Sequence, residues 1–240
     1  MKKNLKMTVF ILLCVILAIL FANNFRSISN GHMETGSGIG TTTTPAAENN
    51  AFIQNQDILD WNLILVNEWN YIPKNYNVTL MTLKNNYQID ERIYPDLQEM
   101  FDAARNEGIY PLIGEAYRTS NDQQSLYTNK VNAYIAKGYS EKEAKELAKA
   151  WVALPGTSEH QLGLALDINA EKDKCTNDEV YKWLYENSYK YGFIMRYPSD
   201  KVEITGVNYE PWHYRYVGRE AAEEIYKQGI CFEEYLDSLK

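Results

Sequence analysis

Two short stretches of the sequence carry side chains that could bind one metal ion together. His160 and Asp167 lie seven residues apart in SEHQLGLALDI, and His213 lies in EPWHYRY. The chain has only three histidines. A catalytic zinc ion usually takes three protein ligands from His, Asp, Glu or Cys and leaves a fourth position for water. His160, Asp167 and His213 are therefore candidate zinc ligands.

The residues around these three side chains favour the same chemistry. Asp167 interrupts the apolar run LALDIN, where a buried carboxylate is costly unless it is paired or bound to a cation. Gly163 and Ala165 carry almost no side chain, so we expect the backbone there to come close to a metal ion or a substrate. Glu210 precedes His213 by three residues and could take a proton from a bound water. The residues alone predict a zinc hydrolase.

Three motifs, in the same order, resemble those of the VanY-type D-alanyl-D-alanine carboxypeptidases. SEHQLGLALD resembles the family's S-x-H-x-x-G-x-A-x-D motif, and EPWH resembles its E-x-W-H motif. AYRTSNDQQSLY, residues 116–127, resembles its Y-R-S-x-x-x-Q element. The resemblance covers about residues 60–240, and Thr119 stands where the family usually has Ser, which leaves a hydroxyl in place.

The resemblance implies a role for each residue that matches a motif. The positions that match the zinc ligands are His160, Asp167 and His213. Glu210 matches the catalytic base, and Arg118 matches an arginine that steadies the substrate carbonyl or the developing oxyanion. Ser158 and Gln123 match substrate-binding positions.

The implied activity is zinc-dependent removal of the terminal D-Ala from peptidoglycan stem peptides. An L,D-carboxypeptidase acting on tetrapeptide stems is an alternative, because related families share these motifs. A non-catalytic cell-wall-binding module that kept the zinc site is another, which Glu210 disfavours. A bifunctional dipeptidase is disfavoured because dipeptide pools are cytoplasmic, whereas the catalytic domain is expected outside the cell. Whether the terminal residue is D-Ala or D-lactate, and whether the role is antibiotic resistance or wall trimming, stays open.

The N-terminus indicates a place in the cell membrane. MKKNLK is basic, and the next 16 residues, Met7 to Ala22, carry no charge. We therefore expect a signal anchor at residues 1–26, with a cleaved signal peptide as the alternative. The lysines place the short N-terminal side in the cytoplasm and the catalytic domain outside the cell. Residues 27–57, rich in Gly, Ser, Thr and Asn, predict a flexible linker, and residues 58–240 form the expected catalytic domain.

The charge of the chain argues against nucleic acid as a partner. Residues 1–47 hold four of its 24 basic and one of its 32 acidic residues. The remaining 20 basic and 31 acidic residues give residues 48–240 a net charge of −11. Phosphate binding needs a basic surface.

The pattern of apolar residues, caps and breakers predicts an α+β fold, with helices packed on a small, mostly antiparallel sheet that carries the zinc site. The expected helices are 94–108, 120–136, 140–151, 176–190, 219–228 and 232–238. The expected strands are 61–67, 110–118, 193–197, 202–205 and 212–217, together with the run around Asp167. The order suggests helices first and mostly strands later. Capping boxes at Ser140–Glu143 and Thr176–Glu179 open two of the helices.

Cys175 and Cys231 lie 56 residues apart and follow no metal-binding spacing. We expect two unpaired thiols, and a disulfide between them outside the cell is the alternative.

Overall fold

The computed structural model describes residues 61–240. The expected anchor at 1–26, the expected linker at 27–57 and the first three residues of the expected catalytic domain lie outside this range. Within residues 61–240, no helix has the length and apolar character that crossing a membrane requires.

The centre of the fold is a four-stranded antiparallel sheet with strand order β3-β4-β6-β5. Its strands are β3 (Pro111–Glu115), β4 (Ala165–Ala170), β5 (Phe193–Met195) and β6 (His213–Tyr216). A separate antiparallel pair joins β1 (Leu80–Thr82) to β2 (Gln88–Asp90). Strands β4 and β6 are therefore neighbours at the centre of the sheet, although 42 residues separate the end of β4 from the start of β6.

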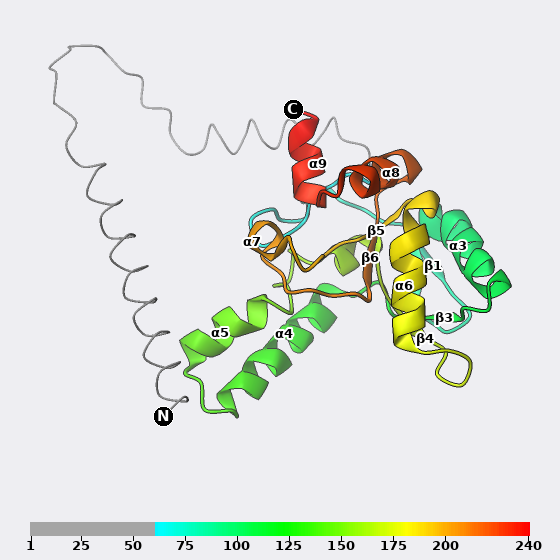
Figure 1. Ribbon diagram of the computed structural model, residues 1–240. Helices are drawn as coiled ribbons and strands as arrows, with labels where there is room; N and C mark the ends of the chain where they lie inside the picture. The colour runs from blue at the N-terminus through cyan, green and yellow to red at the C-terminus, as the bar shows by residue number, and fades with distance from the viewer. Residues whose placement is uncertain (1–60) are drawn as a thin grey trace, which may run out of the picture. The chain divides into compact units, whose positions relative to one another are not determined.

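Helices lie on several sides of this sheet (Figure 1). The helices are α3 (Tyr94–Asn106), α4 (Ser120–Ile135), α5 (Glu141–Lys149), α6 (Asn177–Asn187), α7 (Val202–Thr205), α8 (Arg219–Gln228) and α9 (Phe232–Ser238). The 3-10 turns are η1 (Glu91–Ile93), η2 (Glu159–Leu162) and η3 (Ser188–Tyr191). Helices on an antiparallel sheet confirm the predicted α+β class. Strands and helices alternate along the chain, however, so the expected order of helices first was wrong.

The two faces of the central strands differ in character because successive side chains in a strand point to opposite faces. Leu166, Ile168 and Tyr214 are fully buried in the main core, which includes residues of α3 and α6. The alternate positions Asp167 and His213 fall on the other face. The alternation that builds the core thus also brings the charged and imidazole side chains together.

Two smaller cores complete the packing. Helices α8 and α9 pack against Ile194 of β5 and Val217. Helices α4 and α5 pack against each other through their own cluster, which includes Tyr127 and Ala144. In Figure 1 these two helices extend together from the sheet.

The predicted helix caps are present. Ser140 and Glu143 form a capping box at the start of α5, and Thr176 and Glu179 form one at the start of α6. Thr119, the departure from the family motif, caps α4 by accepting a hydrogen bond from the backbone of Asp122. The hydroxyl that a serine would supply is therefore used here to begin a helix.

The expected strand at 61–67 was wrong, although its residues alternate as a strand would. Leu63 and Leu65 pack against the core of α8 and α9, whereas Ile64 and Val66 belong to the main core. The segment does not join a sheet. Two of its backbone carbonyls, those of residues 62 and 64, instead accept hydrogen bonds from the guanidinium of Arg215 at 3.0 Å.

The expected strand at 202–205 is a single helical turn, α7. Gly206 ends it in a left-handed conformation (φ 72°), and its N–H donates to the carbonyl of Val202 at 2.9 Å. A glycine adopts this conformation without steric cost, so it stops a short helix readily. The hairpin β1–β2 was missed because each strand has only three residues.

Cys175 and Cys231 are both free, as expected. Burial raises the pKa of the Cys231 thiol to about 11. Cys175 lies against the backbone of Tyr110, with its Sγ 3.3 Å from the amide nitrogen.

Candidate functional site

Three separate elements bring the predicted metal ligands together. His160 lies in the turn η2, Asp167 lies in β4, and His213 is the first residue of β6. Asp167 and His213 are register partners on the two central strands. Partners in an antiparallel pair present their side chains on the same face, and η2 places His160 beside them.

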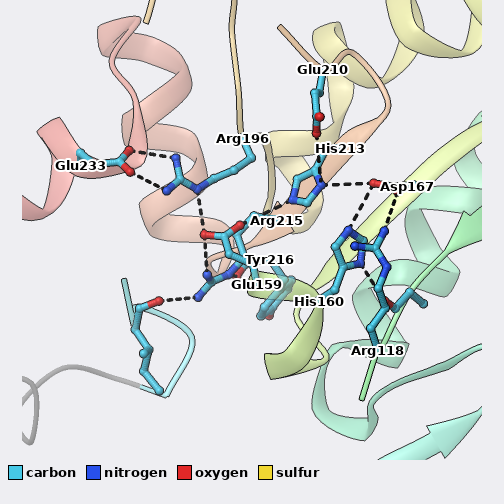
Figure 2. Close-up of polar contacts among 12 residues, drawn as sticks. Arg118, Glu159, His160, Asp167, Arg196, Glu210, His213, Arg215, Tyr216 and Glu233 are labelled. Atoms are coloured by element: carbon cyan, nitrogen blue, oxygen red, sulfur yellow. Dashed lines mark hydrogen bonds and ion pairs between the residues drawn. The ribbon is translucent and has the colours of Figure 1, made fainter. Parts of the chain in front are cut away.

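The three side chains form a compact cluster (Figure 2). The Oδ1 atom of Asp167 lies 3.4 Å from Nε2 of His160 and 3.2 Å from Nδ1 of His213. One ligand atom from each residue lies within 4.8 Å of the other two. In a tetrahedral zinc site with ligand bonds of about 2.1 Å, neighbouring ligand atoms are about 3.4 Å apart. The spacing therefore fits zinc.

Hydrogen bonding in the cluster supports this fit. Asp167 Oδ1 is buried and has no hydrogen-bond partner. Such an orphaned oxygen between two imidazole nitrogens is the arrangement that a bound cation would satisfy. His160 Nδ1 lies 2.7 Å from the carbonyl of Ala116, so it carries the proton and leaves the lone pair on Nε2. A backbone acceptor on the far nitrogen is the usual way to orient a metal-binding histidine.

Gly163 ends η2 in a left-handed conformation (φ 73°), and its role differs from the one expected. A Cβ at this position would lie 2.9 Å from the backbone nitrogen of Asp90, which donates to the Gly163 carbonyl at 3.0 Å. The missing side chain therefore makes room for β2 and not for a metal ion or substrate.

Glu210 lies at the edge of the cluster. The turn that carries it is closed by the N–H of His213, which donates to the Glu210 carbonyl at 3.2 Å. Its Oε2 atom is 3.8 Å from Nδ1 of His213, and the residue is 7% exposed. Burial raises the pKa of Glu210 to about 7, outweighing the opposing charge of His213. A carboxyl group with a pKa near neutrality is suited to accept and return a proton.

Arg118 faces the second carboxylate oxygen of Asp167. Its Nη2 lies 3.4 Å from Asp167 Oδ2, and its Nε lies 3.3 Å from Glu115 Oε2. Its Nη1 donates to Gln123 Oε1 at 3.1 Å. Gln123 is 1% exposed and also donates to the carbonyl of Ala153 at 2.7 Å. The Gln123 side chain thus holds Arg118 in place. The motif implied a different role for Gln123, that of binding substrate.

All seven residues predicted from the sequence line one cavity of about 180 Å³. They are Arg118, Gln123, Ser158, His160, Asp167, Glu210 and His213. Ser158 is buried just before η2. The same cavity is lined by Lys130 of α4 and by Trp151, which the motifs did not include.

The sequence reasoning also missed a buried charge cluster that reaches the cavity through Glu159. It is here called the Glu159 cluster and consists of Glu159, Arg196, Arg215 and Glu233 (Figure 2). The side chains of the first three are fully buried, and that of Glu233 is 12% exposed. Burial alone would raise the pKa of Glu159, but the charges of Arg196 and Arg215 hold it well below its usual range. The sequence does hold a sign of buried charge, because Arg196 and Arg215 are lone charges in apolar or aromatic runs, as Asp167 is.

This fold and this site define a class of protein: an α+β chain whose central strands present a three-residue metal cluster beside a buried glutamate, as in mononuclear zinc hydrolases. Comparison with known proteins identifies the family. Residues 86–219 match the family described as VanY: D-alanyl-D-alanine carboxypeptidase. The chain belongs to this family.

Individual relatives agree with this assignment. A D-alanyl-D-alanine carboxypeptidase of Enterococcus faecalis (strain ATCC 700802 / V583) is 53% identical over 226 residues, which cover 94% of this chain and 84% of that protein. The structure of VanYB in complex with D-alanine-D-alanine is similar with a TM-score of 0.74 and 59% identity, over 75% of this chain and all of that one. A Glu-to-Ala mutant of VanY, the D,D-pentapeptidase of a VanB-type resistance cassette, was solved with Zn(II). It has a TM-score of 0.72 and 60% identity, over 74% of this chain and 99% of that one.

Proposed function

We propose that this protein is a zinc-dependent D,D-carboxypeptidase that removes the C-terminal D-Ala from peptidoglycan pentapeptide stems. One observation carries the proposal: the orphaned Asp167 Oδ1 lies between nitrogens of His160 and His213, in a cavity that Glu210 also lines. Membership of the VanY family supplies the substrate class. His160, Asp167 and His213 are the residues that would hold zinc.

Bound zinc would lower the pKa of a water molecule, so that it can give up a proton and act as a nucleophile near neutral pH. It would also polarise the scissile carbonyl. Glu210 then accepts the proton of the attacking water and returns it to the amine of the departing residue. Arg118 offers a fixed positive charge to the carbonyl oxygen as it gains negative charge. Gln123 and Glu115 hold the guanidinium of Arg118 for this task.

A carboxypeptidase must also recognise the free carboxylate at the end of its substrate. Lys130 lines the cavity on the side formed by α4, and its Nζ lies 5.2 Å from the centre of the Trp151 ring. The positive charge of Lys130 partly opposes the burial that raises the pKa of Glu210. We assign the substrate carboxylate to Lys130, because Arg118 already faces two carboxylates of the protein.

The location of the enzyme is part of the proposal. The basic start and the uncharged run of residues 7–22 support a single-pass anchor at residues 1–26. The composition of residues 27–57 supports a flexible linker that lets the catalytic domain reach stem peptides outside the cell.

The decisive experiment is to incubate the full-length protein and zinc with defined pentapeptide, tetrapeptide and dipeptide stems, and to identify the products by mass. Release of D-Ala from the pentapeptide, with little turnover of the others, supports the proposal. A higher kcat/KM on the tetrapeptide would favour the L,D-carboxypeptidase. Binding without turnover of any stem would favour a non-catalytic wall-binding module.

A further inference from the structure

Glu159 is a buried carboxylate that neither the motifs nor the mechanism uses, and it faces a predicted metal ligand. Its Oε2 atom lies 3.6 Å from Nε2 of His213. Both atoms are buried and neither has a hydrogen-bond partner. Buried polar atoms are almost always paired, and a shift of roughly half an ångström would bring these two within hydrogen-bond distance.

The other oxygen of Glu159 is fully engaged. Oε1 accepts from Nε of Arg196 at 2.8 Å and from Nη1 of Arg215 at 2.9 Å. The two guanidinium groups therefore fix the carboxylate and leave only Oε2 directed at His213.

The arginines are themselves held from behind. Arg196 donates twice to Glu233 of α9, at 2.8 and 2.6 Å. Arg215 donates to the carbonyls of Asn62 and Ile64 at 3.0 Å. Two carboxylates and two arginines make the cluster neutral, so it can stay buried.

The orientation of His213 gives this contact a purpose. Its Nδ1 faces Asp167 Oδ1 at 3.2 Å, so Nδ1 must offer a lone pair if the ring is to bind the same ion. The proton of the neutral ring then lies on Nε2, which points at Glu159 (Figure 2). His160 has the opposite arrangement, because its Nδ1 proton is directed at the Ala116 carbonyl.

We propose that Glu159 is a positioning residue for the metal site: it accepts the Nε2 proton of His213 and so fixes the ring in the tautomer whose Nδ1 binds zinc. The inference rests on the zinc ligands of the proposed function. A carboxylate in this position also makes the imidazole a stronger ligand.

The first test needs no variant at Glu159. A proton–nitrogen correlation spectrum of the imidazole rings, recorded on the zinc-loaded full-length chain, should show His160 protonated at Nδ1 and His213 protonated at Nε2. The chain has only three histidines, and His32→Ala removes one of the signals for assignment. A zinc-bound His213 protonated at Nδ1 would overturn the inference. That result would not count against the proposed carboxypeptidase activity, because the spectrum reports on the protonation of the ligand and not on turnover.

The second test compares two charge-removing variants of the Glu159 cluster by chelator competition for zinc. Glu159→Gln should weaken zinc binding about 10- to 100-fold. Glu233→Gln removes a carboxylate from the same cluster without facing His213, so it should lower the melting temperature and leave zinc affinity unchanged. Equal zinc affinities for the two variants would show a purely structural role and would sink the proposal. If Glu159→Gln does not fold, the tautomer spectrum of the unaltered chain decides alone.

Discussion

Asp167 and His213 are direct partners in the register of two central antiparallel strands, and their Oδ1 and Nδ1 atoms lie 3.2 Å apart. The pairing of β4 with β6 therefore sets the distance between two predicted zinc ligands. A slip of one residue in this register would turn His213 toward the core. The register of this strand pair thus positions two of the three predicted ligands, and η2 supplies the third.

We expect one zinc ion per chain, bound by His160, Asp167 and His213. In His213→Ala the remaining two ligands should hold zinc weakly, so metal content after dialysis should fall to a small fraction of one. Activity should be lost as a consequence, and added zinc should restore a little of it. The measurement is metal analysis of the purified full-length chain.

The third histidine of the chain provides the control. His32→Ala should keep full zinc content, because His32 belongs to neither motif. Full zinc occupancy in His213→Ala would refute the assignment of this ligand.

Glu210 should separate chemistry from metal binding. A carboxylate that only moves protons is not needed to hold the ion, so Glu210→Ala should keep its zinc and its fold. Its kcat should fall by at least the roughly 10²- to 10⁴-fold typical of losing a general base, and further because Glu210 acts on both the water and the leaving amine. Zinc content, melting temperature and kcat should be measured on the same preparation.

Glu203→Ala is a matched control for this variant, since Glu203 is an exposed glutamate on the nearby turn α7. It should behave as the unaltered enzyme does. If the side chain of Glu210 only capped the turn at Pro211, Glu210→Ala would lose about 1 kcal/mol of stability and stay active. That outcome, or loss of zinc, would contradict the role given to it.

The sequence allowed the ligand set to be predicted because zinc chemistry restricts residue types sharply. A carboxylate inside an apolar strand and a histidine in a second motif are local signals, and the seven predicted site residues do line one cavity. Breakers such as Gly218 and Gly229 are also local, and they flank α8, whose bounds could be predicted.

The features that were missed depend on contacts between distant segments. Residues 61–67 alternate like a strand, but only the fold shows that two of their backbone carbonyls accept hydrogen bonds from Arg215. Glu159 looks like a polar position between Ser158 and His160, and its partner Arg196 is 37 residues away. No local pattern could have shown that these charges meet in the interior.

Lys130 should affect substrate binding more than turnover. If its ammonium group contacts the substrate carboxylate, Lys130→Met should raise KM about five-fold, which corresponds to about 1 kcal/mol for a partly exposed ion pair. It should change kcat little. A pentapeptide stem ending in an amide should be a poor substrate for the unaltered enzyme, and the variant should discriminate less between acid and amide. Lys172→Met, at an exposed lysine, is the control, and an unchanged preference for the acid in Lys130→Met would refute the assignment.

The proposed anchor makes a topological prediction. Protease added to intact cells should remove the catalytic domain and leave a short fragment that contains residues 1–26 in the membrane. Two results would each contradict the proposal: full protection of the catalytic domain, or a mature form released from the cells.

Glu233 should make the stability of the protein depend on acid. Burial alone would raise its pKa, but the charge of Arg196 and the hydrogen bonds from Arg196 and Asn67 lower it below the usual value of 4.5. A carboxyl group whose pKa is lower in the folded chain contributes stability that is fully present above its unfolded-state pKa. This contribution disappears as the pH falls through the lower, folded-state pKa.

At pH 7, Glu233→Gln should therefore reduce the free energy of unfolding by about 1–3 kcal/mol, the cost of losing hydrogen bonds to a charged group. Below pH 4.5 the difference between the variant and the unaltered chain should shrink, because the unfolded chain binds a proton at Glu233 before the folded chain does. Urea unfolding at a series of pH values measures both effects, with Glu224→Gln, at an exposed glutamate of α8, as the control. A difference that stays constant from pH 7 to pH 3 would show that the ionised pair of Glu233 and Arg196 contributes nothing to stability.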